Sequence, residues 1–292
     1  MIDILNVILP TFIVILIGYL LGKIGKINVT VIVDLIFYVG LPALVFTSMV
    51  DKEIVLVDAV KVWGCSLTII LGCGLAAWVV FKLLRQTHSA LYIPIAIMNT
   101  VNIPFPIISL AYGAEGLAAA TLFYIPSTLL LFSLGVYIAS GKRWKDSLKE
   151  VYRVPAIYAA AAGLLVNLLD ISVPTLVLKP LSLISPMVIP LVLLVLGCNL
   201  STVKITSLPT TLIASFLRIG VGLLLGFVSA NLFHVTGVMR SVVILDSAMP
   251  SAANTAILAM KYNNESELIS SVVFVTTIAS LVVIPFLLSV LS

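Results

Sequence analysis

Two long hydrophobic stretches of this chain are interrupted at their centres by proline and asparagine, about 150 residues apart. The first interruption reads Asn99-Thr-Val-Asn-Ile-Pro-Phe-Pro106, and the second reads Met249-Pro-Ser-Ala-Ala-Asn-Thr255. A helix interior disfavours proline, because the ring removes a backbone donor and clashes with the preceding turn. In lipid, a broken helix is tolerated only where it is buried in protein or lines a wet cavity. Two such breaks in corresponding halves are typical of a secondary transporter with its substrate site near the membrane midplane.

The composition indicates an integral membrane protein. Of the 292 residues, 61% are hydrophobic and 10% are charged, and the mean hydropathy is +1.25. A soluble chain carries about 25% charged residues, so we expect an all-α membrane protein with little material outside the bilayer. The start, Met1-Ile-Asp3, lacks the basic residues of a signal peptide, so the first apolar run is interpreted as a retained span.

Ten transmembrane helices are predicted, because a spanning helix needs roughly 20 apolar residues. The connections between them are short, which leaves no room for a separate soluble domain. The predicted spans are residues 4–22, 30–50, 59–84, 90–110, 116–139, 152–169, 175–200, 208–233, 238–261 and 266–290.

The basic residues predict the orientation. The loops after the odd-numbered spans hold eleven lysine and arginine residues, and the opposite loops hold four. Cytoplasmic loops carry the excess of positive charge, so both termini are predicted to lie outside the cell, in the plasma membrane. The most basic segment, residues 142–153, is interpreted as a topology anchor, with a lipid or partner site as the alternative. The eleven are Lys23, Lys26, Lys82, Arg85, Lys142, Arg143, Lys145, Lys149, Arg153, Lys204 and Lys261, and the four are Lys52, Lys61, Lys179 and Arg240.

Short matches divide the chain into two similar halves. Leu9-Pro10 followed by Gly18 matches Val154-Pro155 followed by Gly163. Tyr112 and Tyr262 lie in a second matching pair of segments, and Gly40-Leu-Pro42 resembles Val188-Ile-Pro190. We therefore predict a first five-helix repeat at residues 1–141, a basic cytoplasmic link at 142–153 and a second repeat at 154–292. An odd number of spans in each half inverts the second repeat relative to the first.

A substrate site is predicted at the two breaks. Broken half-helices expose positive N-terminal ends and free carbonyls, and asparagine amides both donate and accept hydrogen bonds without carrying charge. The alternative is a pair of proline kinks whose polar residues only bind neighbouring helices. The predicted substrate-binding residues are Asn99, Thr100, Asn102, Pro106, Pro250, Ser251 and Asn254.

Two charged residues fall well inside predicted spans. Arg218 lies in the eighth span, and Asp246 lies in the ninth, one turn before Pro250. Charges at such depth are rare and face a cavity or each other. One interpretation makes Asp246 a proton or cation coupling group and Arg218 the counter-charge of the site, and the other makes them a structural ion pair. Asp34, near the start of the second span, is interpreted as interfacial, with the coupling site as its alternative.

No enzyme motif is present. The two histidines, His88 and His234, lie near span ends, and there is no phosphate-binding glycine loop. We therefore expect no catalytic activity, cofactor, metal site or nucleic-acid partner. Transport is expected to run on gradients, with H+ or Na+ as the candidate coupling ions, or through a partner protein. The cysteines, Cys65, Cys73 and Cys198, lack metal-ligand spacing and are expected to be buried.

The motifs at the two breaks resemble those of the auxin efflux carrier family, which includes plant auxin exporters and bacterial malonate and malate carriers. The resemblance covers nearly the whole chain. Asn99-Thr100 precedes Pro106 by seven residues and is followed by Tyr112-Gly-Ala-Glu115. The second break reads Met249-Pro-Ser-Ala-Ala-Asn254 and is followed by Lys261-Tyr262, and Gly40-Leu-Pro42-Ala-Leu-Val-Phe46 also fits.

The resemblance implies ten helices in two inverted repeats, arranged as a scaffold-like bundle and a transport bundle. It also implies that spans four and nine cross at Pro106 and Pro250, that an anion binds near Asn99, and that the protein works as a homodimer by an elevator or rocking motion. Two departures argue against auxin as the substrate. Val101, Asn102 and Phe105 stand where the family often has glycines, and the long cytoplasmic loop of many plant exporters is absent.

The expected function is secondary active or facilitated transport of small organic anions, in particular carboxylates. A sodium or proton exchanger of similar architecture is one alternative, although it would be expected to show paired acidic residues at the crossing. A membrane receptor that binds a ligand without moving it is the other alternative.

Overall fold

The computed structural model describes residues 4–25, 28–50, 54–86, 88–140 and 144–291. The regular structure in these ranges is helical, apart from one isolated β-bridge between Met98 and Ser251. Met1–Asp3, Lys26, Lys52, Lys142, Arg143 and the predicted boundary at residues 141 and 142 lie outside the described residues.

The first half of the chain contains α1 (Ile4–Ile24), α2 (Val29–Leu35), α3 (Leu41–Val50), α4 (Leu56–Leu83), α5 (Tyr92–Ala96), α6 (Pro104–Leu130) and α7 (Val136–Ser140). After α8 (Trp144–Val151), the second half contains α9 (Pro155–Leu168), α10 (Thr175–Ile184), α11 (Val188–Leu200), α12 (Leu208–Phe216), α13 (Gly222–Leu232), α14 (Gly237–Ser247), α15 (Ala253–Tyr262) and α16 (Ser266–Leu291). Short π turns join α2 to α3, α6 to α7 and α12 to α13, and a 3-10 turn joins α10 to α11.

Seven helices among the described residues are long and apolar enough to cross a membrane, and the number rises to eight if the bent pair of α8 and α9 is one span. This count is lower than the ten predicted spans because the predicted fourth and ninth spans are each broken into short helices. The fourth is α5, the 97–103 segment and the start of α6, and the ninth is α14, the 248–252 segment and α15. The bilayer criterion of about 20 residues therefore misses these pieces.

The described part of the basic link is mostly helical. Residues 144–151 form helix α8, which makes an angle of 62° with α9. Its charges pair locally, because Lys149 contacts Asp146 at 3.1 Å and Arg153 contacts Glu150 at 3.5 Å. Pro155 then begins α9, where its missing N–H and fixed φ suit the first helical turn.

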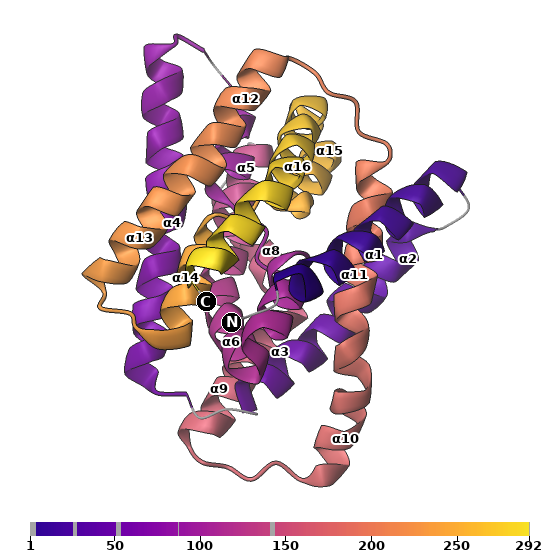
Figure 1. Cartoon of the computed structure of the whole chain (residues 1–292), viewed down its shortest axis with the longest axis vertical. Helices are drawn as coiled ribbons and strands as arrows, with labels where there is room; N and C mark the ends of the chain where they lie inside the picture. The colour runs from indigo at the N-terminus through magenta and orange to yellow at the C-terminus, as the bar shows by residue number, and fades with distance from the viewer. Residues whose placement is uncertain (1–3, 26–27, 51–53, 87, 141–143, 292) are drawn as a thin grey trace.

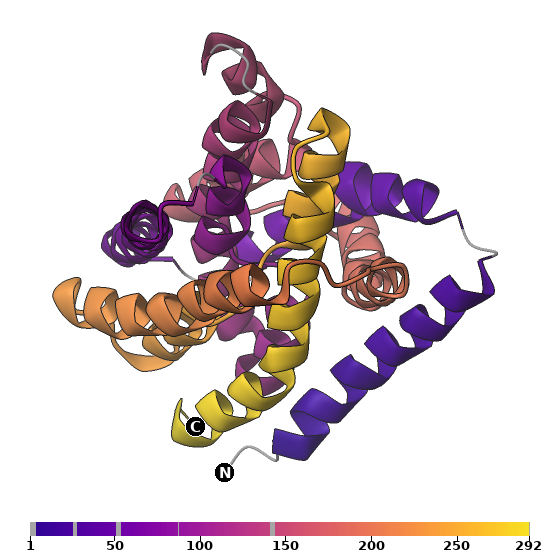
Figure 2. The same cartoon turned by 90° about the horizontal axis from the view of Figure 1, so that it is seen from above.

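The helices form two bundles. In the first bundle, α1 packs along α11, and α3 packs along α9. In the second bundle, α4 packs against α6 and α13, α14 packs against α6 and α13, and α16 packs against α12 and α15. Figure 1 shows α4, α12 and α13 on one side of the molecule and α1, α10 and α11 on the other. In the view from above, α16 runs between the two groups (Figure 2).

Two equivalent glycines allow close helix contacts in the first bundle. A Cβ at Gly18 of α1 would overlap the backbone of Leu194 in α11. A Cβ at Gly163 of α9 would press on Met49 and the carbonyl of Phe46 in α3. The first helix of each half thus packs on the second helix of the other half through the glycine that the sequence match singled out, in the small-residue mode common in membranes.

A second pair of matched positions has left-handed backbone. Gly113 has φ +61° and ψ −149° and interrupts the helical stretch from residue 104 to residue 140. Asn263, which ends α15, has φ +52° and ψ +47°. The predicted boundary between the fourth and fifth spans therefore consists of a single non-helical residue, where glycine is strongly favoured because it lacks a Cβ.

Candidate substrate site at two broken helices

The two breaks contact each other directly. The N–H of Asn99 donates to the carbonyl of Pro250 at 2.7 Å, and the N–H of Ala252 donates to the carbonyl of Ile97 at 3.1 Å. These two bonds bracket Met98 and Ser251, which form an antiparallel bridge. The pairing is the pattern of one antiparallel ladder step, and it satisfies backbone groups that each helix would otherwise leave unpaired where it stops.

The remaining free carbonyls at the ends of α5 and α14 are bound by side chains. Ser251 Oγ donates to the carbonyl of Pro94 at 2.7 Å. Arg218 Nη1 donates to the carbonyls of Ile95 and Ala96 at 2.8 and 2.9 Å, and Arg218 Nη2 donates to the carbonyl of Ser247 at 2.8 Å. An unsatisfied backbone group costs several kcal/mol in an apolar medium, so these bonds make the double break tolerable.

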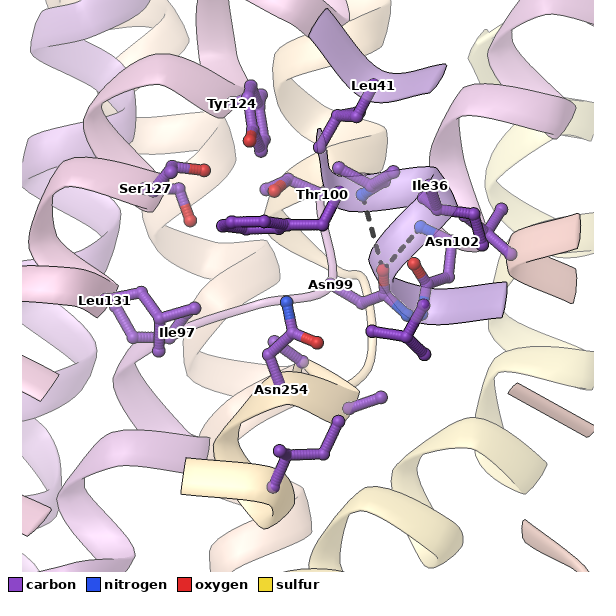
Figure 3. Close-up of a pocket in the computed structure, with 18 of the residues that line it drawn as sticks. Ile36, Leu41, Ile97, Asn99, Thr100, Asn102, Tyr124, Ser127, Leu131 and Asn254 are labelled. Atoms are coloured by element: carbon purple, nitrogen blue, oxygen red, sulfur yellow. Dashed lines mark hydrogen bonds between the residues drawn. The ribbon is translucent and has the colours of Figure 1, made fainter. Parts of the chain in front are cut away.

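A pocket lies beside the crossing of the two breaks (Figure 3). Its cavity volume is about 90 Å³. The 97–102 segment forms one wall, α6 and α15 contribute further walls, and the first bundle closes the pocket through α2, the π turn after it, α3 and α11. The polar residues of the lining are Asn99, Thr100, Asn102, Tyr124, Ser127, Thr128, Asn199 and Asn254.

Asn99, a lining residue of this pocket, has a hydrogen-bond donor without a partner among the described residues. Its Oδ1 accepts from the N–H of Val101 at 3.3 Å and from the N–H of Asn102 at 2.9 Å, as the dashed lines in Figure 3 show. Because both partners are donors, only the amide oxygen can face them, and the orientation of the amide is fixed. Asn99 is 3% exposed, and its Nδ2 has no hydrogen-bond partner in the part of the chain that the structure describes. A buried donor without a partner is costly, so this position is ready for an acceptor.

The other asparagines surround the same space. Asn254 lies in the first turn of α15 and is exposed, with its amide directed toward the 97–102 segment in Figure 3. Asn102 belongs to the first break, and Asn199 comes from the opposite wall, near the end of α11. The pocket is therefore bordered by uncharged amides on several sides, one of them from the first bundle.

The positive ends of two helices adjoin the pocket. The first turn of α15, with Ala253 and Asn254, lines it, and α6 begins two residues after Asn102. Neither helix has a side-chain N-cap. Pro104 and Pro106 lack N–H groups, so α6 contributes mainly its dipole, and α15 contributes both dipole and N–H groups. The described residues of the lining include no lysine, arginine, histidine, aspartate or glutamate.

Four of the predicted substrate-binding residues line the pocket, namely Asn99, Thr100, Asn102 and Asn254. Three do not. Pro106 is buried in the first turn of α6, Pro250 contributes its carbonyl to the bridge, and Ser251 is fully buried, with its hydroxyl on Pro94 and its N–H bonded to Thr276 Oγ1 at 3.1 Å.

Arg218 and Asp246 are both fully buried, and neither lines the pocket. The ion pair considered as one alternative is not formed: Arg218 binds carbonyl groups, and both carboxylate oxygens of Asp246 lack a hydrogen-bond partner among the described residues. Arg218 lies in the π turn between α12 and α13, and its side chain reaches the carbonyl groups at the ends of α5 and α14. Asp34 is exposed on α2, away from the lining.

A second cavity of about 370 Å³ adjoins the pocket. The two cavities share Asn199, Ala253 and Ile257. The second cavity extends between α11, α15 and α16 to Lys204 and Glu267. The shared residues place this cavity next to the pocket, on the side of the loop that follows α11, and Asn199 belongs to both linings.

Sequence reasoning missed four polar residues of the lining. Tyr124, Ser127 and Thr128 lie in the long α6 helix. Serine and threonine hydroxyls in a helix usually bind the backbone of that helix, and a single tyrosine in an apolar run gives no site signal. Ser127 Oγ instead lies 3.9 Å from the sulfur of Met98, at the first break. Asn199 offered a weak signal, since it is a lone amide at the end of an otherwise apolar run.

Comparison with known proteins assigns the chain to a family. A family model described as "Membrane transport protein" matches twice, at residues 3–150 and 142–288. An uncharacterized transporter of Methanocaldococcus jannaschii is 26% identical over 297 residues, which cover 96% of each chain. An uncharacterized transporter of Methanothermobacter thermautotrophicus is 27% identical over 293 residues, which cover 95% of each chain. The two successive matches agree with the two predicted repeats, and this multi-pass helical protein belongs to the membrane transport protein family of the auxin efflux carriers.

Proposed function

We propose that this transporter moves small organic anions, in particular carboxylates, and that they bind in the pocket beside the two breaks. The observation that carries the proposal is the buried Asn99 amide in the pocket lining, whose Nδ2 has no hydrogen-bond partner among the described residues. The same lining includes a helix N-terminus and, within the described part of the chain, no charged side chain. A carboxylate offers acceptors only, so it complements this donor and the uncapped N–H groups of α15.

Helix ends supply the favourable charge in place of a lysine or arginine. An N-terminus carries roughly half a positive elementary charge, and half-helix N-termini serve anionic substrate groups in other transporters. The amides of Asn102, Asn199 and Asn254 would orient the anion by hydrogen bonds. The small volume of the pocket, about 90 Å³, favours a small acid over an aromatic one such as auxin.

The transport cycle follows from the division into two bundles. Residues from both bundles line the pocket, so an elevator or rocking motion of one bundle against the other would change the side from which the pocket is reached. In this proposal the chain has ten spans in two inverted repeats, with the breaks near the midplane of the plasma membrane and both termini outside. The second cavity, which includes Lys204 and Glu267 in its lining, is then proposed as the path between the pocket and the cytoplasm. The exposed apolar surface of α2 and α10 would suit a homodimer.

Asp246 is proposed to couple transport to H+ or Na+. A buried carboxylate without a hydrogen-bond or ion-pair partner is unfavourable, and intramembrane carboxylates of this kind often lie on ion pathways. Asp246 lies in the last turn of α14, next to the second break, so a bound cation there would act on the backbone that forms the site.

A sodium or proton exchanger without an organic substrate is less well supported. Exchange sites of this type need acidic ligands for the cation, and no aspartate or glutamate lines the described pocket. The receptor alternative predicts that the same acid binds but is not moved. Flux measurements separate both alternatives from the proposal.

The test is substrate-induced current from purified protein in proteoliposomes on a solid-supported membrane, with a panel of mono- and dicarboxylates and aromatic acids. A saturable current for a small acid, lost in Asn99→Ala and Asn254→Ala, is expected. Asn231→Ala, an amide change outside the pocket, serves as the matched control. Current only with sodium or pH jumps would favour the exchanger, and acid binding without current or isotope uptake would favour the receptor.

A further inference from the structure

Arg218 is a fully buried guanidinium that contacts no carboxylate among the described residues. Its hydrogen bonds go to the backbone carbonyls that end two broken half-helices from opposite halves of the chain. We infer that Arg218 is a positioning residue that joins the ends of α5 and α14 and cancels their negative charge, so that the pocket is left with a net positive potential. This inference rests on the proposed anion transport for its electrostatic part, and its structural part is independent of the substrate.

The local structure is shaped around this side chain. Arg218 lies in the π turn Leu217–Val221, and such turns inside helices frequently mark functional sites. Gly222 follows it, and a Cβ there would overlap both Arg218 Nη2 and the carbonyl of Ser247. Glycine at this position therefore leaves the space through which the guanidinium reaches α14. The thiol of Cys73 in α4 lies beside the same group.

Two helix ends offset part of the Arg218 charge without an acidic partner. The C-terminus of a regular helix carries roughly half a negative elementary charge. The ends at Ala96 and Ser247 both contribute, and α5 contributes less because it has only five residues. This accounts for a fully buried arginine whose hydrogen-bond partners among the described residues are three neutral carbonyl groups.

The effect reaches the pocket through the backbone. Ile97 follows Ala96 in the chain and lines the pocket. Its carbonyl accepts the hydrogen bond from the N–H of Ala252. Without Arg218, the carbonyl ends of α5 and α14 would keep their negative charge next to an anion site. Because Arg218 does not line the pocket, it acts on the substrate through the two half-helices and not by direct contact.

Three variants test the inference. Arg218→Met removes the charge and all three hydrogen bonds, while Arg218→Lys keeps the charge and a shorter donor. Gly222→Ala displaces the guanidinium without changing any charge. Arg240→Met is the control, because Arg240 lies in α14 but donates to Asn231 Oδ1 at 2.6 Å, away from the pocket.

The first readout is hydrogen–deuterium exchange of peptides that cover residues 92–103 and 244–256, in detergent and without substrate. In Arg218→Met and Gly222→Ala, exchange is expected to rise in both peptides together, with a smaller rise in Arg218→Lys and none in Arg240→Met. A rise in only one of the two breaks, or in neither, would overturn the joining role. A variant that does not fold is replaced by Arg218→Lys, which retains a donor.

The second readout compares binding of the transported acid with binding of its uncharged amide. In Arg218→Met, the acid is expected to bind roughly tenfold more weakly, because two helix-end charges are exposed, whereas binding of the amide changes less than about threefold. Arg218→Lys should restore most of the preference for the acid. Equal losses for acid and amide would overturn the electrostatic role. If the wild-type protein binds no acid, the proposed function fails, and the exchange experiment still decides the joining role.

Discussion

The N–H of Asn99 donates a 2.7 Å hydrogen bond to the carbonyl of Pro250, which joins the two residues that most clearly interrupt their helices. Pro250 has no N–H of its own, but the pairing does not need one because only the Pro250 carbonyl takes part. Each break therefore supplies some of the backbone hydrogen-bond partners that the other break lacks. This mutual pairing holds the Asn99 amide at the pocket, with its oxygen occupied and its nitrogen free.

Asn99→Asp is the sharpest test of the anion site. The aspartate keeps an oxygen for the N–H groups of Val101 and Asn102, so the local turn is preserved. It replaces the free donor with a second, negatively charged oxygen. Loss of a hydrogen bond to a charged group costs about 1.5–3 kcal/mol, so binding of the acid should weaken at least 10- to 100-fold, and more than in Asn99→Ala. Isothermal titration of the purified protein measures this, and unchanged affinity would remove Asn99 from the site.

Asn199 is predicted to contact the substrate from the first bundle. Asn199→Leu should weaken acid binding about tenfold, as expected for one lost hydrogen bond, whereas Asn231→Ala should leave it unchanged.

Cysteine labelling tests the same position from one side of the membrane. In a variant with Cys65, Cys73 and Cys198 replaced by alanine, Asn199→Cys should react with a thiol reagent applied from the side of Lys204, and the acid should protect it. Thr202→Cys, farther along the second cavity, should react without protection. Labelling of Asn199→Cys only from the opposite side would contradict the proposed route.

Asp246→Asn is predicted to remove the coupling ion. The change keeps the size of the side chain and abolishes its charge, so dependence of the acid current on pH or on sodium should flatten while binding of the acid remains. Asp34→Asn is the control, because Asp34 is exposed and outside the pocket. Unchanged dependence on both ions would make Asp246 a structural residue.

The sequence predicted where the helices break, because proline and asparagine are conspicuous in apolar runs. It also predicted four residues of the pocket, all of which lie at those breaks. It could not predict the bridge between Met98 and Ser251, since backbone pairing outside a strand has no side-chain signature. The hydrogen-bond partners of Arg218 could not be predicted for a related reason: they are backbone carbonyl groups, which every residue has. Tyr124 and Ser127 join the pocket only through the packing of α6.

Gly113→Ala is predicted to destabilise the protein without touching the pocket. Gly113 has φ +61° and ψ −149°, a conformation accessible almost only to glycine, so a Cβ there costs about 1–3 kcal/mol. A Cβ at Gly113 would meet no neighbouring atom within 4 Å, which means that the cost comes from backbone strain and not from a clash.

Gly74→Ala is the control for Gly113→Ala, because its Cβ would make only an ordinary 3.8 Å contact with Ala96. Thermal unfolding in detergent should show a lower midpoint temperature for Gly113→Ala than for the wild-type protein, and an unchanged midpoint for Gly74→Ala. Equal midpoints for Gly113→Ala and the wild-type protein would mean that the helical stretch from residue 104 to residue 140 does not need its interruption.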